Sequence, residues 1–140
     1  DIYFKNQKIA GTLIENTITG NKIRTSIIGI GINVNQLNFD DSLNAVSLAL
    51  MKGMKTNVGD LAYTFIDHFN PVLYRASVNP EEVKQEFLEN MLFYKKNASF
   101  EAEDRRFTAM VEGVDSWGRL MLNELGTMRS FGMKEVKLIW

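Results

Sequence analysis

The chain has 140 residues, of which 45% are hydrophobic and 24% charged, and its formal net charge is −1. This composition is typical of a folded globular domain, and the charge argues against a general nucleic-acid binder, which carries a basic excess. The sequence contains no cysteine, which excludes disulfides and thiolate metal sites and fits a reducing, cytoplasmic location. No apolar run approaches the roughly 18 residues that a membrane span requires.

Three strands are expected in the first 35 residues. Ile2–Phe4 and residues 8–15 flank a turn and form a hairpin. Residues 16–21 are rich in turn formers, and a third strand covers residues 24–35. The third strand is almost continuously apolar, which predicts burial on both of its faces. Because the chain starts at Asp1 and runs at once into a strand, we expect it to be a fragment of a longer protein.

From residue 40 onward the apolar residues follow helical spacing. The first helix is expected to take its N-cap from residues 40–42 and to end at Gly53. Asn57 is the expected cap of a second helix, which Pro71 should kink or end, and the pair Asn79–Pro80 should start a third. The residues expected on the buried faces are Val58, Leu61, Phe65, Phe69 and Leu73, followed by Val83, Phe87, Leu88 and Met91.

Residues 95–97 form the expected boundary between a first domain, 1–95, and a second, 96–140. Beyond them the apolar residues alternate, and turn signals recur about every ten residues, which predicts five short strands. The sequence therefore predicts an α+β fold, with part of a mixed sheet and packed helices followed by a small β-barrel. Glu101, Glu103 and Asp104, beside Arg105 and Arg106, are expected at an exposed hairpin tip.

A ligand site is indicated by glycines in the second and third strands. A strand interior disfavours glycine unless another backbone or a ligand must come close. Gly11, Gly29 and Gly31 all stand in such positions, and Lys8 lies near Gly11 as a point charge suited to a phosphate or carboxylate. A lone strand lysine is more often a solvated residue, and Asn33 more often has its amide satisfied by the backbone. These residues predict a platform without specifying its chemistry.

No other cluster in the sequence indicates a site. His68 is the only histidine, and its helical position favours a surface residue over a catalytic base. One histidine and no cysteine exclude the usual zinc ligand sets, so no metal site is predicted.

The segment Lys8-Ile9-Ala10-Gly11-Thr12-Leu13-Ile14-Glu15, together with Gly29-Ile30-Gly31-Ile32-Asn33, resembles the biotin protein ligase family. That family has a Lys-x-x-Gly-x-Leu-x-Glu strand, preceded by Asn-Asp and followed by a Gly-x-Gly-x-Asn strand. Residues 44–48 resemble its next helix, and residues 113–136 resemble its C-terminal SH3-like domain. The last strand departs from the family pattern near Glu135 and Ile139.

The resemblance implies a ligase that forms biotinyl-5′-AMP from biotin and ATP, with Mg²⁺ brought by ATP, and then transfers biotin to a lysine of a biotin carboxyl carrier protein. Lys8 matches the catalytic lysine, which also contacts biotin. The matches to the biotin pocket are Gly11, Leu13, Gly29 and Ile32, and those to the nucleotide side are Asp1 and Asn33. The family's glycine- and arginine-rich loop has no counterpart in this chain, so the fragment alone is expected to be inactive.

Two other functions remain open from the sequence. The chain could be a non-catalytic module of the same fold that binds a ligand or partner, or a relative of the lipoate ligases. The resemblance also implies a possible homodimer through the main sheet, and nucleic-acid binding only where a parent protein has an N-terminal DNA-binding domain. No membrane partner is expected, because no apolar run is long enough to span a membrane.

Overall fold

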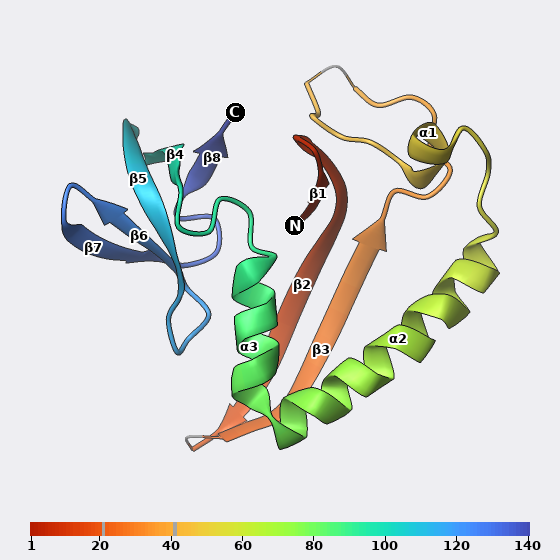
Figure 1. Ribbon diagram of the computed structural model, residues 1–140, viewed down its shortest axis with the longest axis horizontal. Helices are drawn as coiled ribbons and strands as arrows, with labels where there is room; N and C mark the ends of the chain where they lie inside the picture. The colour runs from red at the N-terminus through yellow and green to blue at the C-terminus, as the bar shows by residue number, and fades with distance from the viewer. Residues whose placement is uncertain (21, 41) are drawn as a thin grey trace. The chain divides into compact units, whose positions relative to one another are not determined.

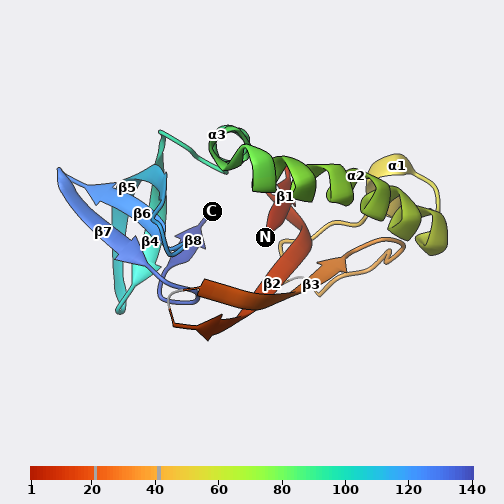
Figure 2. The ribbon, with the colours of Figure 1, turned by 90° about the horizontal axis from the view of Figure 1, so that it is seen from below.

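The computed structural model describes residues 1–20, 22–40 and 42–140. The chain separates into two compact units, Asp1–Asp67 and His68–Trp140. Figures 1 and 2 show that the first unit contains one sheet and the second another, with helices between them in the sequence. The α+β class is therefore confirmed, while the domain boundary between residues 95 and 96 stays a prediction.

The first sheet has three antiparallel strands in the order β1 (Ile2–Phe4), β2 (Gln7–Thr19) and β3 (Lys22–Ile32). The expected hairpin is present, with Phe4 paired to Gln7. The turn expected at residues 16–21 is wrong for residues 16–19, since β2 continues through them paired with β3, with one register shift between Thr17 and Ile18. Gly20 has a φ of 62°, so the chain turns there. Asn21 lies outside the described residues.

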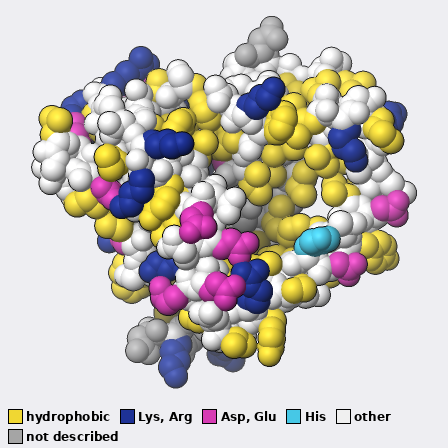
Figure 3. Space-filling model, in the orientation of Figure 1, with side chains coloured by type: hydrophobic (Ala, Val, Ile, Leu, Met, Phe, Trp, Pro, Cys, Tyr) yellow, Lys and Arg dark blue, Asp and Glu magenta, His cyan; other side chains and the backbone are white. Residues whose placement is uncertain are grey.

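The expectation that the third strand is buried on both faces is wrong. Every residue of β3 is exposed, although most of its side chains are apolar. Burial on both faces requires a layer of structure on each face. The start of helix α2 (Val58–Val78) lines a groove with Ile30 and Ile32, the last apolar residues of β3. Figure 3 shows hydrophobic side chains gathered in the hollow beside this part of α2.

Helix α1 (Leu48–Lys52) is shorter than expected and starts later. Its N-cap is Ser47, whose buried hydroxyl accepts from the amide of Leu50 at 3.2 Å and donates to the carbonyl of Gln36 at 2.6 Å. The cap expected at residues 40–42 is therefore wrong: Asp40 instead accepts from the amide and hydroxyl of Ser42 in a local turn. Asp41 lies outside the described residues. The expected end at Gly53 is confirmed by its left-handed φ of 69°.

Helix α2 starts as expected, because the Asn57 carboxamide accepts from the amides of Gly59 and Asp60 at 2.8 and 3.3 Å. Pro71 does not end it, and the helix continues to Val78. Helix α3 (Pro80–Glu89) has its proline in the first turn, as expected. Its Asn79 cap makes no capping bond to the backbone and donates instead to the Glu82 carboxylate at 2.9 Å.

The apolar faces of α2 and α3 are less buried than expected. Neither helix contains a buried residue. Phe87, for example, is 52% exposed, whereas Met91, just beyond α3, packs against the core of the second unit. The helical spacing is therefore confirmed, and the predicted degree of burial is wrong.

The second unit contains the five predicted strands in the order β7-β6-β5-β4-β8. Their bounds are β4 (Asn97–Ala102), β5 (Arg105–Val114), β6 (Leu120–Glu124), β7 (Thr127–Phe131) and β8 (Lys137–Ile139). Every strand pair that the structure describes in the two sheets is antiparallel, so the expected mixed pairing is absent from this part of the chain. The sheet is open, with β7 and β8 at its edges, and it is not a closed barrel among the described residues.

The core of the second unit lies on one face of this sheet. Leu122 has no exposed surface, and it clusters with Phe100, Ala102, Phe107, Ala109, Val111 and Phe131. These residues alternate along their strands with exposed or half-buried ones, as a one-sided sheet requires. The predicted hairpin tip is confirmed for Glu103 and Asp104, which take positive φ values, 53° and 58°, in a two-residue turn between β4 and β5. Glu101, Arg105 and Arg106, expected at the same tip, lie in the two strands.

Candidate ligand site

An irregularity in β2 determines where the Lys8 side chain points. Ile2 pairs with Ala10 but Tyr3 pairs with Lys8, so Ile9 is an extra residue on β2. In a regular strand, Lys8 and Gly11 would face opposite sides of the sheet because three positions separate them. The bulge shifts the alternation by one residue and turns Lys8 to the face of Gly11. Its ammonium lies 3.3 Å from the point where a Gly11 Cβ would stand.

The backbone of Lys8 is held by segments distant in the sequence. Its amide donates to the Asn44 carbonyl at 2.8 Å, and its carbonyl accepts from the Val46 amide at 3.0 Å. The Asn33 carboxamide donates to the same carbonyl at 3.4 Å. Lys8 also forms a parallel bridge with Ala45. Lys8 is therefore fixed on two sides, which pre-organises the start of its side chain.

The counter-ion of Lys8 is Asp1. The Lys8 ammonium lies 2.8 Å from the Asp1 carboxylate, and each side chain is 43% exposed. An ion pair that exposed is worth about 0–1 kcal/mol. Such a pair orients the lysine, yet it costs little to exchange Asp1 for another anion.

The glycines form the floor of this face. Gly11 pairs with Gly31, and Leu13 pairs with Gly29, so their side-chain positions share one face of the sheet. A Cβ on Gly31 would meet nothing within 4 Å, and one on Gly29 would meet only the Leu13 carbonyl at 3.8 Å. The glycine pair Gly11–Gly31, with Gly29 opposite Leu13, leaves an open surface near the Lys8 ammonium on which a planar or bicyclic group can lie.

Asn33 connects the floor to the loop that follows. Its carboxamide nitrogen donates to the carbonyls of Lys8 and Val46, at 3.4 and 3.2 Å, and its own amide donates to the Ile9 carbonyl at 2.9 Å. The expectation that its amide is satisfied by the backbone is therefore confirmed. Asn33 therefore lies close to Lys8, and its contacts hold the backbone of β2 against the segment around Val46.

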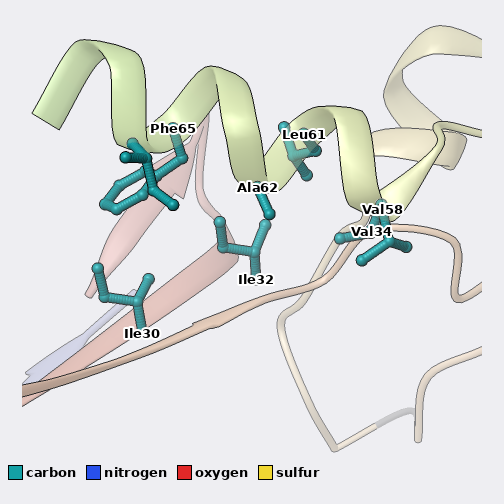
Figure 4. A pocket seen from close by; sticks show the side chains of 8 residues that line it. Ile30, Ile32, Val34, Val58, Leu61, Ala62 and Phe65 are labelled. Atoms are coloured by element: carbon teal, nitrogen blue, oxygen red, sulfur yellow. The ribbon is translucent and has the colours of Figure 1, made fainter.

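Ile32 is the one predicted site residue that lies on the other face of the sheet. It pairs with Ala10 and points toward α2, where Ile30, Val34 and Phe65 line the same groove (Figure 4). The groove has a volume of about 370 Å³, and its other lining residues are Val58, Leu61, Ala62 and Ile66. The structure thus brings together Asp1, Lys8, Gly11, Leu13, Gly29 and Asn33, and it separates Ile32 from them.

The sequence did not indicate that the segment 44–46 takes part in the site, although this segment holds the backbone of Lys8. It was expected to be helical, and it instead runs alongside Lys8 in an extended form. The side chain of Asn44 donates a hydrogen bond to the Asn6 carbonyl at 2.7 Å, which connects the β1–β2 turn to this segment.

A second contact that the sequence did not indicate joins Asn35 to Thr56. The Asn35 carboxamide forms two hydrogen bonds with the Thr56 backbone, at 2.8 and 2.9 Å. A cluster of asparagines in a loop is the only sequence signal for these ties.

Other kinds of site receive no support in the described part of the chain. No group of three or more histidine, cysteine, aspartate or glutamate side chains there could hold a metal ion. His68 is exposed on α2, as expected. None of the helices described is long and apolar enough to cross a bilayer.

A scan against protein-family models and a search of curated proteins each find no match. Solved structures do match. The apo structure of biotin protein ligase from Aquifex aeolicus superposes with a TM-score of 0.74 at 22% identity, over 99% of this chain and 62% of that one. The same ligase in complex with biotin and ATP gives a TM-score of 0.73 at 22% identity, over 99% of this chain and 59% of that one.

This likeness shows that the chain has the fold of the biotin protein ligase structures, which confirms the resemblance at the level of fold. The chain spans about 60% of the length of the solved structures that it matches.

Proposed function

We propose that this chain is part of a biotin protein ligase and carries the lysine that assists formation of biotinyl-5′-AMP. The observation that carries the proposal is the Lys8 ammonium, which a strand bulge turns over a floor of facing glycines. The fold likeness to a ligase whose structure was solved with biotin and ATP supports it. The activity belongs to the whole protein, and the 140-residue chain alone is proposed to be inactive.

In the proposed first step, a carboxylate oxygen of biotin attacks the α-phosphorus of ATP, and pyrophosphate leaves as the mixed anhydride forms. In the second step, a carrier lysine amine attacks the acyl carbon, the amide bond forms, and AMP and a proton leave. Lys8 contributes by stabilising the negative charge that builds on the oxygens around phosphorus. A strand-fixed ammonium does this without reorganising, because its backbone is already held by Asn44 and Val46.

The remaining site residues have proposed roles of two kinds. Leu13 and Gly29 border the open part of the floor and would face the biotin rings. Gly11 lies on the same face beneath the Lys8–Asp1 pair, and Ile32 lies on the opposite face. Asp1 and Asn33 flank Lys8 and would lie toward the nucleotide. No carboxylate cluster accompanies them among the described residues, so Mg²⁺ would be held by the ATP phosphates.

The further parts of the proposal concern domains and partners. Residues 96–140 would be an SH3-like domain, which their five-stranded sheet supports. The acceptor would be a biotin carboxyl carrier protein, and the exposed edge of β3 would support a homodimer through the first sheet. The lack of cysteine supports a cytoplasmic location.

Calorimetry with biotin and lipoate, on the protein that carries this chain, tests the substrate class. We expect biotin to bind and lipoate to bind at least tenfold more weakly, a difference of about 1.4 kcal/mol. Preferential binding of lipoate would assign the chain to the lipoate ligases. If neither acid binds, the platform has a structural or partner-binding role, and the proposal fails.

A further inference from the structure

The three glycines of the platform have different surroundings. A Cβ on Gly31 would meet nothing within 4 Å, and one on Gly29 would make only an ordinary contact with the Leu13 carbonyl. A Cβ on Gly11 would stand 3.2 Å from the Asp1 carboxylate oxygen, 3.3 Å from Lys8 Nζ and 3.4 Å from Lys8 Cε. The space above Gly11 is therefore filled by the chain's own ion pair, while the space above the other two is open.

From this difference we propose that Gly11 and Asp1 are positioning residues for Lys8, and this inference rests on the proposed function. Gly11 lets the lysine side chain lie flat along β2, and Asp1 holds the ammonium in that position. A ligand carboxylate or phosphate that approaches Lys8 must then displace Asp1. Clearance for the ligand comes from Gly29 and Gly31.

The displacement follows from charge and exposure. Lys8 and Asp1 neutralise each other, so an incoming anion meets a lysine that already has a counter-ion. Both side chains are about half exposed and end in flexible groups, so water can stabilise Asp1 once Lys8 leaves it. Asp1 thus keeps Lys8 extended over the floor and weakens its hold on a ground-state carboxylate. In the transition state negative charge builds on the oxygens around phosphorus, and this charge attracts Lys8 more strongly than the ground-state carboxylate does.

Two alanine variants distinguish the glycine that lies beneath the Lys8–Asp1 ion pair from a glycine that leaves space for the ligand. The methyl group of Gly11→Ala would stand 3.2 Å from the Asp1 carboxylate and 3.3 Å from the Lys8 ammonium, so both ends must shift by a few tenths of an ångström. Gly31→Ala, at the paired position on β3, leaves them in place. Neither glycine has a left-handed backbone, so both variants should fold. We expect crystal structures of the two variants to show the ends of Lys8 and Asp1 displaced from the floor in Gly11→Ala and unmoved in Gly31→Ala. An unshifted Lys8 ammonium in Gly11→Ala would overturn the role of Gly11, and this result requires no ligand.

The kinetics of adenylate formation distinguish a residue that positions Lys8 from one that makes room for biotin. In adenylate formation, Gly11→Ala should lower kcat and leave the KM for biotin nearly unchanged, whereas Gly31→Ala should raise that KM. A raised KM with unchanged kcat in Gly11→Ala would make Gly11 part of the ligand clearance and overturn the assignment.

Calorimetry with biotin and its neutral amide tests Asp1. The affinity ratio of acid to amide should rise about two- to fivefold in Asp1→Asn, the range that an exposed ion pair supports. An unchanged or lower affinity ratio would contradict the inference that the ligand carboxylate displaces Asp1 from Lys8. If the ratio is unchanged and ATP binds more weakly, Asp1 contacts the nucleotide instead. If biotin does not bind the unchanged protein, the proposed function fails, and the crystal structures still decide the role of Gly11.

Discussion

The core of the second unit gives the prediction with the largest expected effect on stability. Leu122 has no exposed surface and lies in the middle of β6, among the aromatic residues of the cluster. Leu122→Ala removes three carbon groups, which accounts for about 2.4 kcal/mol of transfer free energy at about 0.8 kcal/mol each. The cavity left behind adds to this, so the free energy of unfolding should fall by about 3–5 kcal/mol.

The control is Leu125→Ala, since Leu125 is 100% exposed in the turn after β6. Its effect should stay within about 0.5 kcal/mol. Urea unfolding followed by tryptophan fluorescence measures both variants, because the two tryptophans of the chain, Trp117 and Trp140, belong to the second unit. If Leu122→Ala lowers the urea midpoint no more than Leu125→Ala, the assignment of this core is wrong.

Three further predictions concern acid stability, helix capping and the activity of the chain alone. The Arg105 guanidinium, bonded at 2.7 Å to each carboxylate oxygen, holds the pKa of Glu124 below its ordinary 4.5. A lowered native-state pKa gives stability that is complete above the unfolded-state value and is lost as the pH falls below it. Urea titrations at neutral pH and at roughly pH 3 should therefore show a smaller acid loss in Glu124→Gln than in the unchanged protein, and an equal loss would contradict the role of this pair. Ser47→Ala should cost the first unit about 1–3 kcal/mol, because it leaves the amide of Leu50 without its cap acceptor. Hydrogen exchange at that amide measures the effect, and unchanged protection would refute it. The purified 140-residue chain should transfer no biotin to a carrier protein in a streptavidin blot, and efficient transfer would show that the chain is sufficient.

The alternating strands of the second unit were predictable because each has one buried face. Phe107, Ala109 and Val111 are all buried on β5, whereas Thr108 and Met110 between them are exposed or half-buried. A period of two then predicts the strand, and Glu103 and Asp104 predict the turn at its start. The open edges of this sheet were not predictable, because barrel closure depends on strand length and stagger across the whole sheet.

The first unit shows where sequence periodicity stops being informative. Its apolar β3 has the composition of a buried central strand, and composition does not tell which elements cover a strand. The α1 start was missed because Asp40 and Ser47 are both good caps, and the choice between them depends on the long-range bond from Ser47 to Gln36.

The residues of the candidate site were predictable, but their geometry was not. The family motif identifies Lys8 and the glycines by spacing alone. The bulge at Ile9 that turns Lys8 to the face of Gly11 involves pairing with β1, which no local pattern in β2 reveals. The same limit applies to the segment 44–46, whose extended form depends on its bonds to Lys8.

The most direct test of the proposed function is the rate of biotinyl-5′-AMP formation from biotin and ATP in the protein that carries this chain. The comparison is between Lys8→Ala and Lys5→Ala, since Lys5 lies in the adjacent β1–β2 turn and outside the platform. We predict that Lys8→Ala lowers the rate at least about 100-fold, the loss typical of removing a group that stabilises transition-state charge, and that Lys5→Ala retains the normal rate. A normal rate in Lys8→Ala would contradict the catalytic assignment.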